Sequence, residues 1–146
     1  TIIEPDSIYE VECDIFSPCA LGGILNSKTI PTIRSAIVAG GANNQLLHDI
    51  DGVKLHKRGI LYAPDYLINA GGIINASCEI NQTYQPQRAK EMTERIYETM
   101  DRVISISSER NTPTSTTADQ MARSRLGKIQ KPKKIYRNHV TTNTSG

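Results

Sequence analysis

The sequence is poor in aromatic residues: it has no tryptophan and a single phenylalanine among 146 residues. Hydrophobic residues still make up 38% of the chain, so we expect one domain with an aliphatic core. No apolar run is long enough to span a membrane, and the first residues lack a signal-peptide pattern, which together favour a cytoplasmic protein. Because residue 1 is Thr1 and not methionine, we expect a processed chain or a fragment.

Cysteine is also scarce. Cys13, Cys19 and Cys78 form no CxxC or Cys/His pattern, which argues against structural zinc and a disulfide framework and favours reduced thiols. Cys19 follows an expected strand, where a reactive thiol is conceivable, but the interpretation as a small buried hydrophobe is favoured. His48 and His56 are poorly spaced for a metal pair, and we interpret them as exposed polar residues of a helix.

Acidic residues are absent from the end of the chain. Residues 1–122 carry 10 basic and 15 acidic side chains, whereas residues 123–146 carry 7 basic side chains and no acidic one. Such a run can bind nucleic acid. It lacks interleaved aromatic residues and ends in "TTNTSG", so residues 127–146 are expected to form a basic, polar, flexible tail, and nucleic acid is not expected as a partner.

The rest of the sequence alternates between strand and helix patterns. Short apolar runs predict strands around Ile15 and Phe16, over 35–41 and over 60–69. The intervening patterns predict a short helical turn that opens at Ser27 or Thr29, and helices over 42–59, 70–82, 86–110 and 116–130. This order predicts an α/β fold: part of a Rossmann-like, mostly parallel sheet with flanking helices and C-terminal helices. Three strands are few for such a sheet and suggest half of one.

Three similar joints connect these elements: "DIFSPCALGGILN" at 14–26, "SAIVAGGANNQLL" at 35–47 and "LYAPDYLINAGGIIN" at 61–75. Each has an apolar run, a glycine pair and an asparagine shortly beyond it. Ligands of open parallel sheets bind at the carboxyl ends of the strands, where the following helices begin. Neutral side-chain amides are expected there from Asn43, Asn69 and Asn75. A single joint is more simply a turn, but three favour a ligand face. The chain has no GxGxxG phosphate motif, so a zwitterion or a nicotinamide amide fits better than phosphate.

The segments "CDIFSPCALGGILN", "AGGANNQL" and "GILYAPDYLINAGGIIN", with the long helix after them, resemble the glutamate, leucine, phenylalanine and valine dehydrogenases, and the leucine branch fits best. The resemblance covers about residues 7–126. It implies that residues 1–126 form the C-terminal part of a dinucleotide-binding domain with C-terminal helices. It also implies NAD-dependent oxidative deamination of an L-amino acid, in which hydride passes from Cα to nicotinamide and a lysine-assisted water attacks the iminium.

Site residues are implied by the same resemblance. The backbone around Cys19 and Ala20 would border the nicotinamide ribose, and Asn43 would contact both the nicotinamide and the substrate. Ile73 and Ala76 would line the pocket for the substrate side chain, which favours a branched-chain amino acid such as leucine.

The sequence also departs from this family. The family's catalytic lysines and aspartate, like its glycine-rich phosphate loop, belong to parts that these 146 residues do not contain, so no catalytic residue is assigned and the chain alone should be inert. Its implied partners are an amino acid, the remainder of a dehydrogenase chain and, in the complete enzyme, further copies of itself. The alternative is a non-catalytic interaction module whose basic tail binds nucleic acid or an acidic partner.

Overall fold

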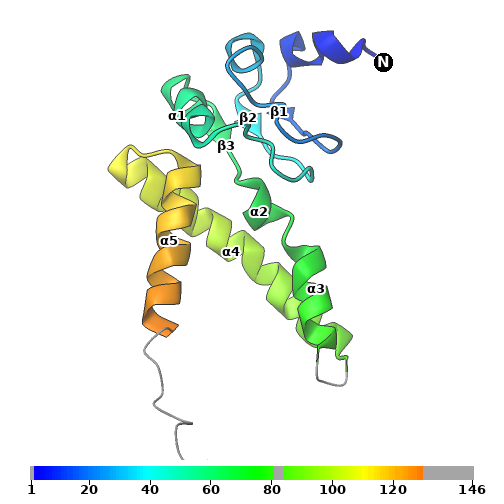
Figure 1. Ribbon diagram of the computed structural model, residues 1–146, viewed down its shortest axis with the longest axis vertical. Helices are drawn as coiled ribbons and strands as arrows, with labels where there is room; N and C mark the ends of the chain where they lie inside the picture. The colour runs from blue at the N-terminus through cyan, green and yellow to red at the C-terminus, as the bar shows by residue number, and fades with distance from the viewer. Residues whose placement is uncertain (1, 81–83, 130–146) are drawn as a thin grey trace, which may run out of the picture.

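The structure is a computed structural model that describes residues 2–80 and 84–129 (Figure 1). Three short strands, β1 (Ile15–Phe16), β2 (Ile37–Val38) and β3 (Leu61–Tyr62), form a sheet in the order β1-β2-β3. Both pairings are parallel, with Ile15 opposite Ile37 and Ile37 opposite Leu61. The expected α/β class with a parallel sheet is therefore confirmed. All three strands also end at the same edge of the sheet.

Helices account for most of the remaining described residues. They are η1 (Pro5–Glu10), η2 (Ile30–Thr32), α1 (Asp49–Lys57), α2 (Asp65–Ile68), α3 (Gly71–Glu79), α4 (Pro86–Arg110) and α5 (Thr114–Ile129). The helix expected over 86–110 is confirmed in full as α4. The helical turn begins after Thr29, with Pro31 in its first turn, as predicted. The helix expected over 70–82 is confirmed as α3, although its last two residues lie outside the described part.

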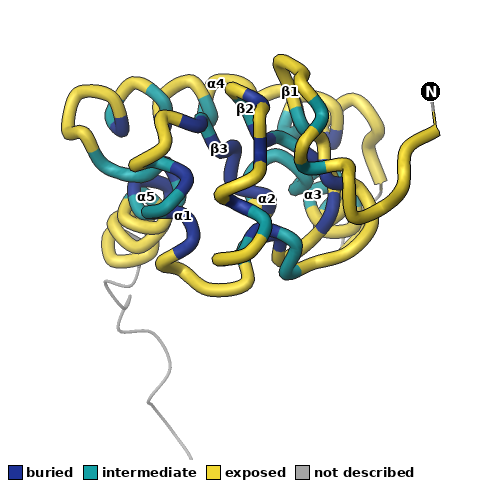
Figure 2. The backbone as a smooth tube through the Cα atoms, turned by 90° about the horizontal axis from the view of Figure 1, so that it is seen from above, coloured by how far each residue is buried: buried dark blue, intermediate teal, exposed yellow. Residues whose placement is uncertain are grey.

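The core is aliphatic, as the scarcity of aromatic residues predicts. Its buried members are Leu25, Ile30, Ile33, Val38, Leu55, Ile60 and Tyr62. Figure 2 shows the buried segments concentrated along β2 and β3, with the outer turns of the helices exposed. Burial of each such side chain contributes about 1.5–3 kcal/mol. The sheet and its loops are therefore anchored by their own packing.

The two outer edges of the sheet differ. The turn between α4 and α5 covers β3, since Thr114 Oγ1 donates a hydrogen bond to the carbonyl oxygen of Tyr62 at 2.5 Å. Asn111 makes this turn in a left-handed conformation, with φ of 49°. On the opposite edge, β1 pairs with no second strand among the described residues, and the Ile15 side chain is 54% exposed. The sheet is closed at β3 and open at β1.

The prediction of a helix from residue 42 is wrong, because α1 begins only at Asp49. Asn44 has a φ of 53°, which a helix does not allow. The preceding residues instead pair with the loop after β1: the Gly23 N–H donates to Asn44 O at 2.7 Å and the Leu25 N–H to Gln45 O at 2.9 Å. Tertiary pairing has overridden the helical spacing of the apolar residues.

The prediction placed His48 within this helix, but His48 lies at the start of the helix. Its N–H donates to Asp51 Oδ2 at 3.1 Å, which satisfies a backbone donor at the helix start. The prediction of a strand over 60–69 is also wrong beyond Tyr62. Pro64 precedes α2, and its carbonyl oxygen accepts hydrogen bonds from the N–H groups of Leu67 and Ile68. The proline marks the start of a helix and not a bulge in a strand.

Predicted effect of filling Gly40. A Cβ at Gly40 would lie 2.1 Å from the carbonyl oxygen of Pro18 and 2.4 Å from its nitrogen, both backbone atoms. We expect Gly40→Ala to lower the free energy of unfolding by about 1–3 kcal/mol or more, because two loops must separate. At the matched control Gly41, the nearest atom to an added Cβ is Cys19 Sγ at 4.0 Å, so Gly41→Ala should be nearly neutral. Chemical unfolding of both variants checks this, and equal losses would contradict it.

Candidate functional site

The loops that follow the strands meet at the carboxyl edge of the sheet. The loop after β1 contacts the loop after β2, since the Ala42 N–H donates to Pro18 O at 2.9 Å. The Gly41 N–H points at Cys19 Sγ, 3.5 Å away. Cys19, Ala20 and Asn43 are all exposed at this edge, so the structure brings the three predicted cofactor-binding residues to one surface.

Asn43 is joined to the third loop by a pair of side-chain amides. Asn69 Nδ2 donates to Asn43 Oδ1 at 2.6 Å and lies 3.5 Å from the carbonyl oxygen of Gly41. Turning the Asn69 amide over would set its oxygen against these two oxygens, so the hydrogen bonds fix its orientation. Asn43 uses its oxygen as an acceptor here and keeps its NH₂ group as a donor. Its side chain therefore suits a carboxylate or carbonyl oxygen better than an ammonium group.

The two predicted substrate-pocket residues lie on α3. Ile73 is 71% exposed and Ala76 is exposed as well. The opposite face of α3 packs against α4, where Cys78 Sγ lies 3.9 Å from Met92 Sδ. In Figure 1, α3 lies farther from the sheet than α2, which connects it to β3. Asn75, the third asparagine of the joints, bonds instead to Tyr84 and Glu79, so it is not part of the amide pair.

Cys19 differs from its favoured interpretation as a small buried hydrophobe, because it is exposed. Proline at position 18 turns the chain away from β1 and leaves the thiol at the surface. A hydrogen bond from the Ser17 hydroxyl, with Oγ 3.4 Å from Sγ, lowers the pKa of Cys19, and the Gly41 N–H lowers this pKa further. Both hydrogen bonds therefore stabilise the thiolate form relative to that of an ordinary cysteine.

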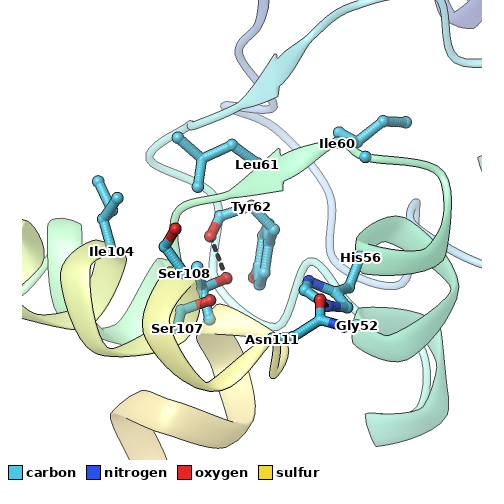
Figure 3. Close-up of a pocket in the computed structure, with 11 residues that line it drawn as sticks. Gly52, His56, Ile60, Leu61, Tyr62, Ile104, Ser107, Ser108 and Asn111 are labelled. Carbon is cyan, nitrogen blue, oxygen red and sulfur yellow. Dashed lines mark hydrogen bonds between the residues drawn. The ribbon is translucent and has the colours of Figure 1, made fainter.

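Two hollows of the described part lie elsewhere. A cavity of about 390 Å³ lies between α1, β3 and the α4–α5 turn. Figure 3 shows His56 and Asn111 side by side within it. His56 Nε2 lies 3.1 Å from Asn111 Oδ1, so this histidine has a structural partner. A groove of about 690 Å³ runs between α4 and α5. Neither hollow is lined by a predicted site residue, so the candidate site is an open face and not a closed pocket.

Metal and membrane sites find no support among the described residues. No three His, Cys, Asp or Glu side chains of residues 2–80 and 84–129 are grouped closely enough to hold a metal ion. None of the helices within those ranges is long and apolar enough to cross a bilayer. Of the basic run, Arg123, Arg125 and Lys128 are exposed on α5, and residues 130–146 lie outside the described part.

Two buried polar residues at this edge were not identified from the sequence. Gln45 is fully buried beneath the loop of Asn43, and Asp65 is buried at the start of α2. The Tyr62 hydroxyl donates to Asp65 Oδ1 at 3.0 Å, and burial, followed by the charge of Asp65, raises the pKa of this tyrosine. The hydroxyl therefore remains a donor. In the sequence, the only signal was an acidic residue placed directly after an apolar run and Pro64.

Predicted reactivity of Cys19. In a variant that keeps Cys19 as its sole cysteine (Cys13→Ser and Cys78→Ser), the thiol should alkylate with a pH midpoint below the ordinary thiol pKa of about 8.5. Ser17→Ala removes the hydroxyl that favours the thiolate and should raise that midpoint. The rate of iodoacetamide labelling against pH measures both values. A midpoint that Ser17→Ala leaves unchanged would contradict the hydrogen bond as the cause.

Comparisons with known proteins agree with this arrangement. Residues 1–133 match the family model for glutamate/leucine/phenylalanine/valine dehydrogenases. The chain is 46% identical over 134 residues to leucine dehydrogenase of Geobacillus stearothermophilus, an alignment that covers 92% of this chain and 36% of the relative. It is 43% identical to L-tryptophan dehydrogenase of Nostoc punctiforme, over 91% of this chain and 38% of the relative.

Solved structures give the same result for the fold. The crystal structure of the Nostoc punctiforme L-tryptophan dehydrogenase superposes with a TM-score of 0.84 at 43% identity, over 90% of this chain and 39% of that one. A glutamate dehydrogenase from Thermus thermophilus, described as hetero-hexameric, shares the fold at a TM-score of 0.72 and 20% identity. This chain thus spans little more than a third of the length of these relatives. Over that span, it belongs to the glutamate/leucine/phenylalanine/valine dehydrogenase family.

Proposed function

We propose that this chain supplies half of the active site of an NAD-dependent L-amino acid dehydrogenase, which deaminates a branched-chain amino acid such as leucine to its 2-oxo acid and ammonia. The observation that carries the proposal is the amide pair of Asn43 and Asn69 at the carboxyl edge of the sheet, 2.6 Å apart. This pair leaves the NH₂ group of the exposed Asn43 available as a donor to a ligand at the edge. Because the chain belongs to the glutamate/leucine/phenylalanine/valine dehydrogenase family, we propose the nicotinamide or the amino acid substrate as the ligand of that donor.

The carboxyl edge suits the nicotinamide end of NAD. No lysine, arginine or histidine occurs in the segments 17–20, 39–44 and 63–70, so these segments carry no basic side chain and offer little to a phosphate. The exposed backbone around Cys19 and Ala20 can border the ribose, and the Asn43 NH₂ can donate to the carboxamide oxygen or to the substrate. NAD, when bound, accepts the hydride. The residues of this chain orient it and hold the substrate beside it.

The substrate side chain would lie against Ile73 and Ala76. Both are apolar and exposed on α3, so an aliphatic side chain can cover them and stabilise the complex by about 0.8 kcal/mol for each buried methylene. Neither side chain can pair with the distal carboxylate of glutamate, and an unpaired buried charge costs several kcal/mol. Leucine, isoleucine and valine are therefore favoured over glutamate.

The remainder of the active site would come from the rest of a dehydrogenase chain. The open edge of β1, with its half-exposed Ile15, offers backbone groups to a further strand of the same sheet. The relatives are nearly three times longer than the matched segment, which leaves ample chain for such strands and for the groups that move protons. We also propose that the complete enzyme is a homo-oligomer; the structure from Thermus thermophilus that shares this fold is described as a hetero-hexamer, so this fold occurs in an oligomeric assembly.

Predicted substrate preference. The complete enzyme should reduce NAD faster with leucine, isoleucine or valine than with glutamate at equal concentration, because the two residues assigned to the pocket, Ile73 and Ala76, are apolar. NADH absorbance at saturating NAD measures the rates. The 146-residue chain, as control, should give no rate above blank. A preference for glutamate would disprove the pocket assignment, and turnover by the control would disprove the half-site.

Predicted effect of removing the Asn43 amide. In the complete enzyme, Asn43→Ala should lose roughly 1–3 kcal/mol of transition-state stabilisation, which corresponds to a decrease of about 5- to 150-fold in kcat/KM. The loss is expected because the cofactor or substrate oxygen that is buried against Asn43 no longer receives a hydrogen bond. The control is Asn75→Ala, which removes an amide of equal size that bonds Tyr84 and Glu79 on α3. Steady-state kinetics compare the two variants. If Asn75→Ala costs as much as Asn43→Ala, the amide pair is not the functional feature.

A further inference from the structure

Gln45 lies beneath the loop that presents Asn43. Its side chain is fully buried, and its Nε2 donates to two carbonyl oxygens of the same loop, Gly40 O at 2.7 Å and Ala42 O at 2.9 Å. Both hydrogens of the NH₂ group are thus used. Reversal of the amide would place Oε1 against the two carbonyl oxygens, so the network permits one orientation.

This orientation leaves one buried polar atom of Gln45 without a hydrogen bond, which an apolar core side chain would not do. Gln45 Oε1 is buried and has no hydrogen-bond partner among the described residues. Buried acceptors without a partner are rare in folded proteins and destabilise them. An apolar side chain would leave no such oxygen, but it would also leave both loop carbonyls without their donor. The Gln45 side chain therefore meets the hydrogen-bonding requirement of the loop and not the packing requirement of the core around it.

The backbone of Gln45 joins the loops after all three strands. Its carbonyl oxygen accepts from the Leu25 N–H at 2.9 Å, in the loop after β1. Its N–H points at Asp65 Oδ2, 3.4 Å away, at the start of α2, which follows β3. Asp65 is held in turn by the Tyr62 hydroxyl, which donates to Oδ1 at 3.0 Å and accepts from the Asp65 N–H at 3.3 Å.

Asn43 directly follows the segment whose two carbonyls Gln45 fixes. Ala42 directly precedes it, and Gly41, between the two anchored residues, directs its own carbonyl oxygen at Asn69 Nδ2. The loop has two glycines and a left-handed Asn44, so its backbone has few internal restraints of its own. A change at Gln45 should therefore move Asn43 relative to Asn69 before it disturbs the sheet.

We propose that Gln45 is a positioning residue of the dehydrogenase site, which holds the Gly40–Ala42 backbone so that Asn43 keeps its contact with Asn69 and its donor faces cofactor and substrate. Tyr62 and Asp65 support it from β3. This role rests on the function proposed above for Asn43. It requires that Gln45 acts on catalysis only through Asn43.

A double-mutant cycle in the complete enzyme tests this requirement. Gln45→Met keeps the length of the side chain and removes its donors. It should lower kcat roughly 10- to 100-fold, the loss expected from a misplacement of about 1 Å, with a smaller change in KM. In the Asn43→Ala background the same substitution should lower kcat less than about 3-fold, because the group that it positions is already absent. Equal losses in both backgrounds overturn the proposal.

A readout without cofactor accompanies the kinetics. In a crystal structure of the cofactor-free Gln45→Met enzyme, the Asn69 Nδ2–Asn43 Oδ1 contact, 2.6 Å here, should be lost while the strands keep their pairing. An intact contact overturns the proposal. The matched control is Thr117→Val, which removes a buried hydroxyl bonded to Thr112 Oγ1 at 2.9 Å in α5. It should lower the melting temperature but leave kcat within about 2-fold of wild type, since it touches no loop of the edge.

Tyr62→Phe replaces Gln45→Met if the latter does not fold. It removes only the hydroxyl that holds Asp65, so a smaller loss in kcat, about 3- to 10-fold, should also vanish in the Asn43→Ala background. In that case an unchanged kcat for Tyr62→Phe overturns the proposal. Failure of the proposed function looks different: the wild-type enzyme would then form no NADH with any amino acid, or Asn43→Ala would have no effect.

Discussion

The contact between the backbones of Gly40 and Pro18 fixes the arrangement of the carboxyl edge. The Gly40 Cα faces Pro18 so closely that a Cβ has no room, and two residues on, the Ala42 N–H bonds the Pro18 carbonyl. Strands of two residues supply only a few ladder hydrogen bonds, so they cannot by themselves hold long loops in register. The loops are aligned by this direct contact instead. The positions of Cys19, Gly41 and Asn43 all follow from it.

The edge formed in this way has no basic side chain in the segments 17–20, 39–44 and 63–70 and is rich in hydrogen-bond donors. Cys19 receives hydrogen bonds from Ser17 and Gly41, and Asn43 presents its NH₂ group because Asn69 occupies its oxygen. The one carboxylate close beneath the edge, Asp65, is buried and satisfied by Tyr62 and by the backbone. Under the proposed function, such an edge would bind oxygen atoms of an uncharged or zwitterionic ligand, and Ile73 and Ala76 of α3 would add a preference for aliphatic groups.

Much of this arrangement could be predicted from the sequence, and the part that could not has a common cause. The helix over 86–110 was predicted because its apolar residues repeat with helical period and Pro86 marks its start. The apolar residues of the segment 42–59 have mostly helical spacing, yet Gln45 and Leu46 pair with Leu25 from a loop twenty residues earlier. The exposure of Cys19 and the burial of Gln45 depend on the same contacts between loops. Periodicity reports on single elements, whereas these features arise where three elements meet.

The unequal edges of the sheet give it a direction of growth. At β3, Thr114 already occupies the carbonyl oxygen of Tyr62, so the α4–α5 turn ends the sheet with residues that follow it in the sequence. At β1, any added strand would have to be parallel to its neighbours to continue the pattern, and parallel strands require a crossover connection. Closure at β3 is itself a long-range event in folding, because Thr114 lies 52 residues after Tyr62. In the described residues, the β3 edge is covered by a later part of the same chain, and β1 is the edge to which a further strand can add.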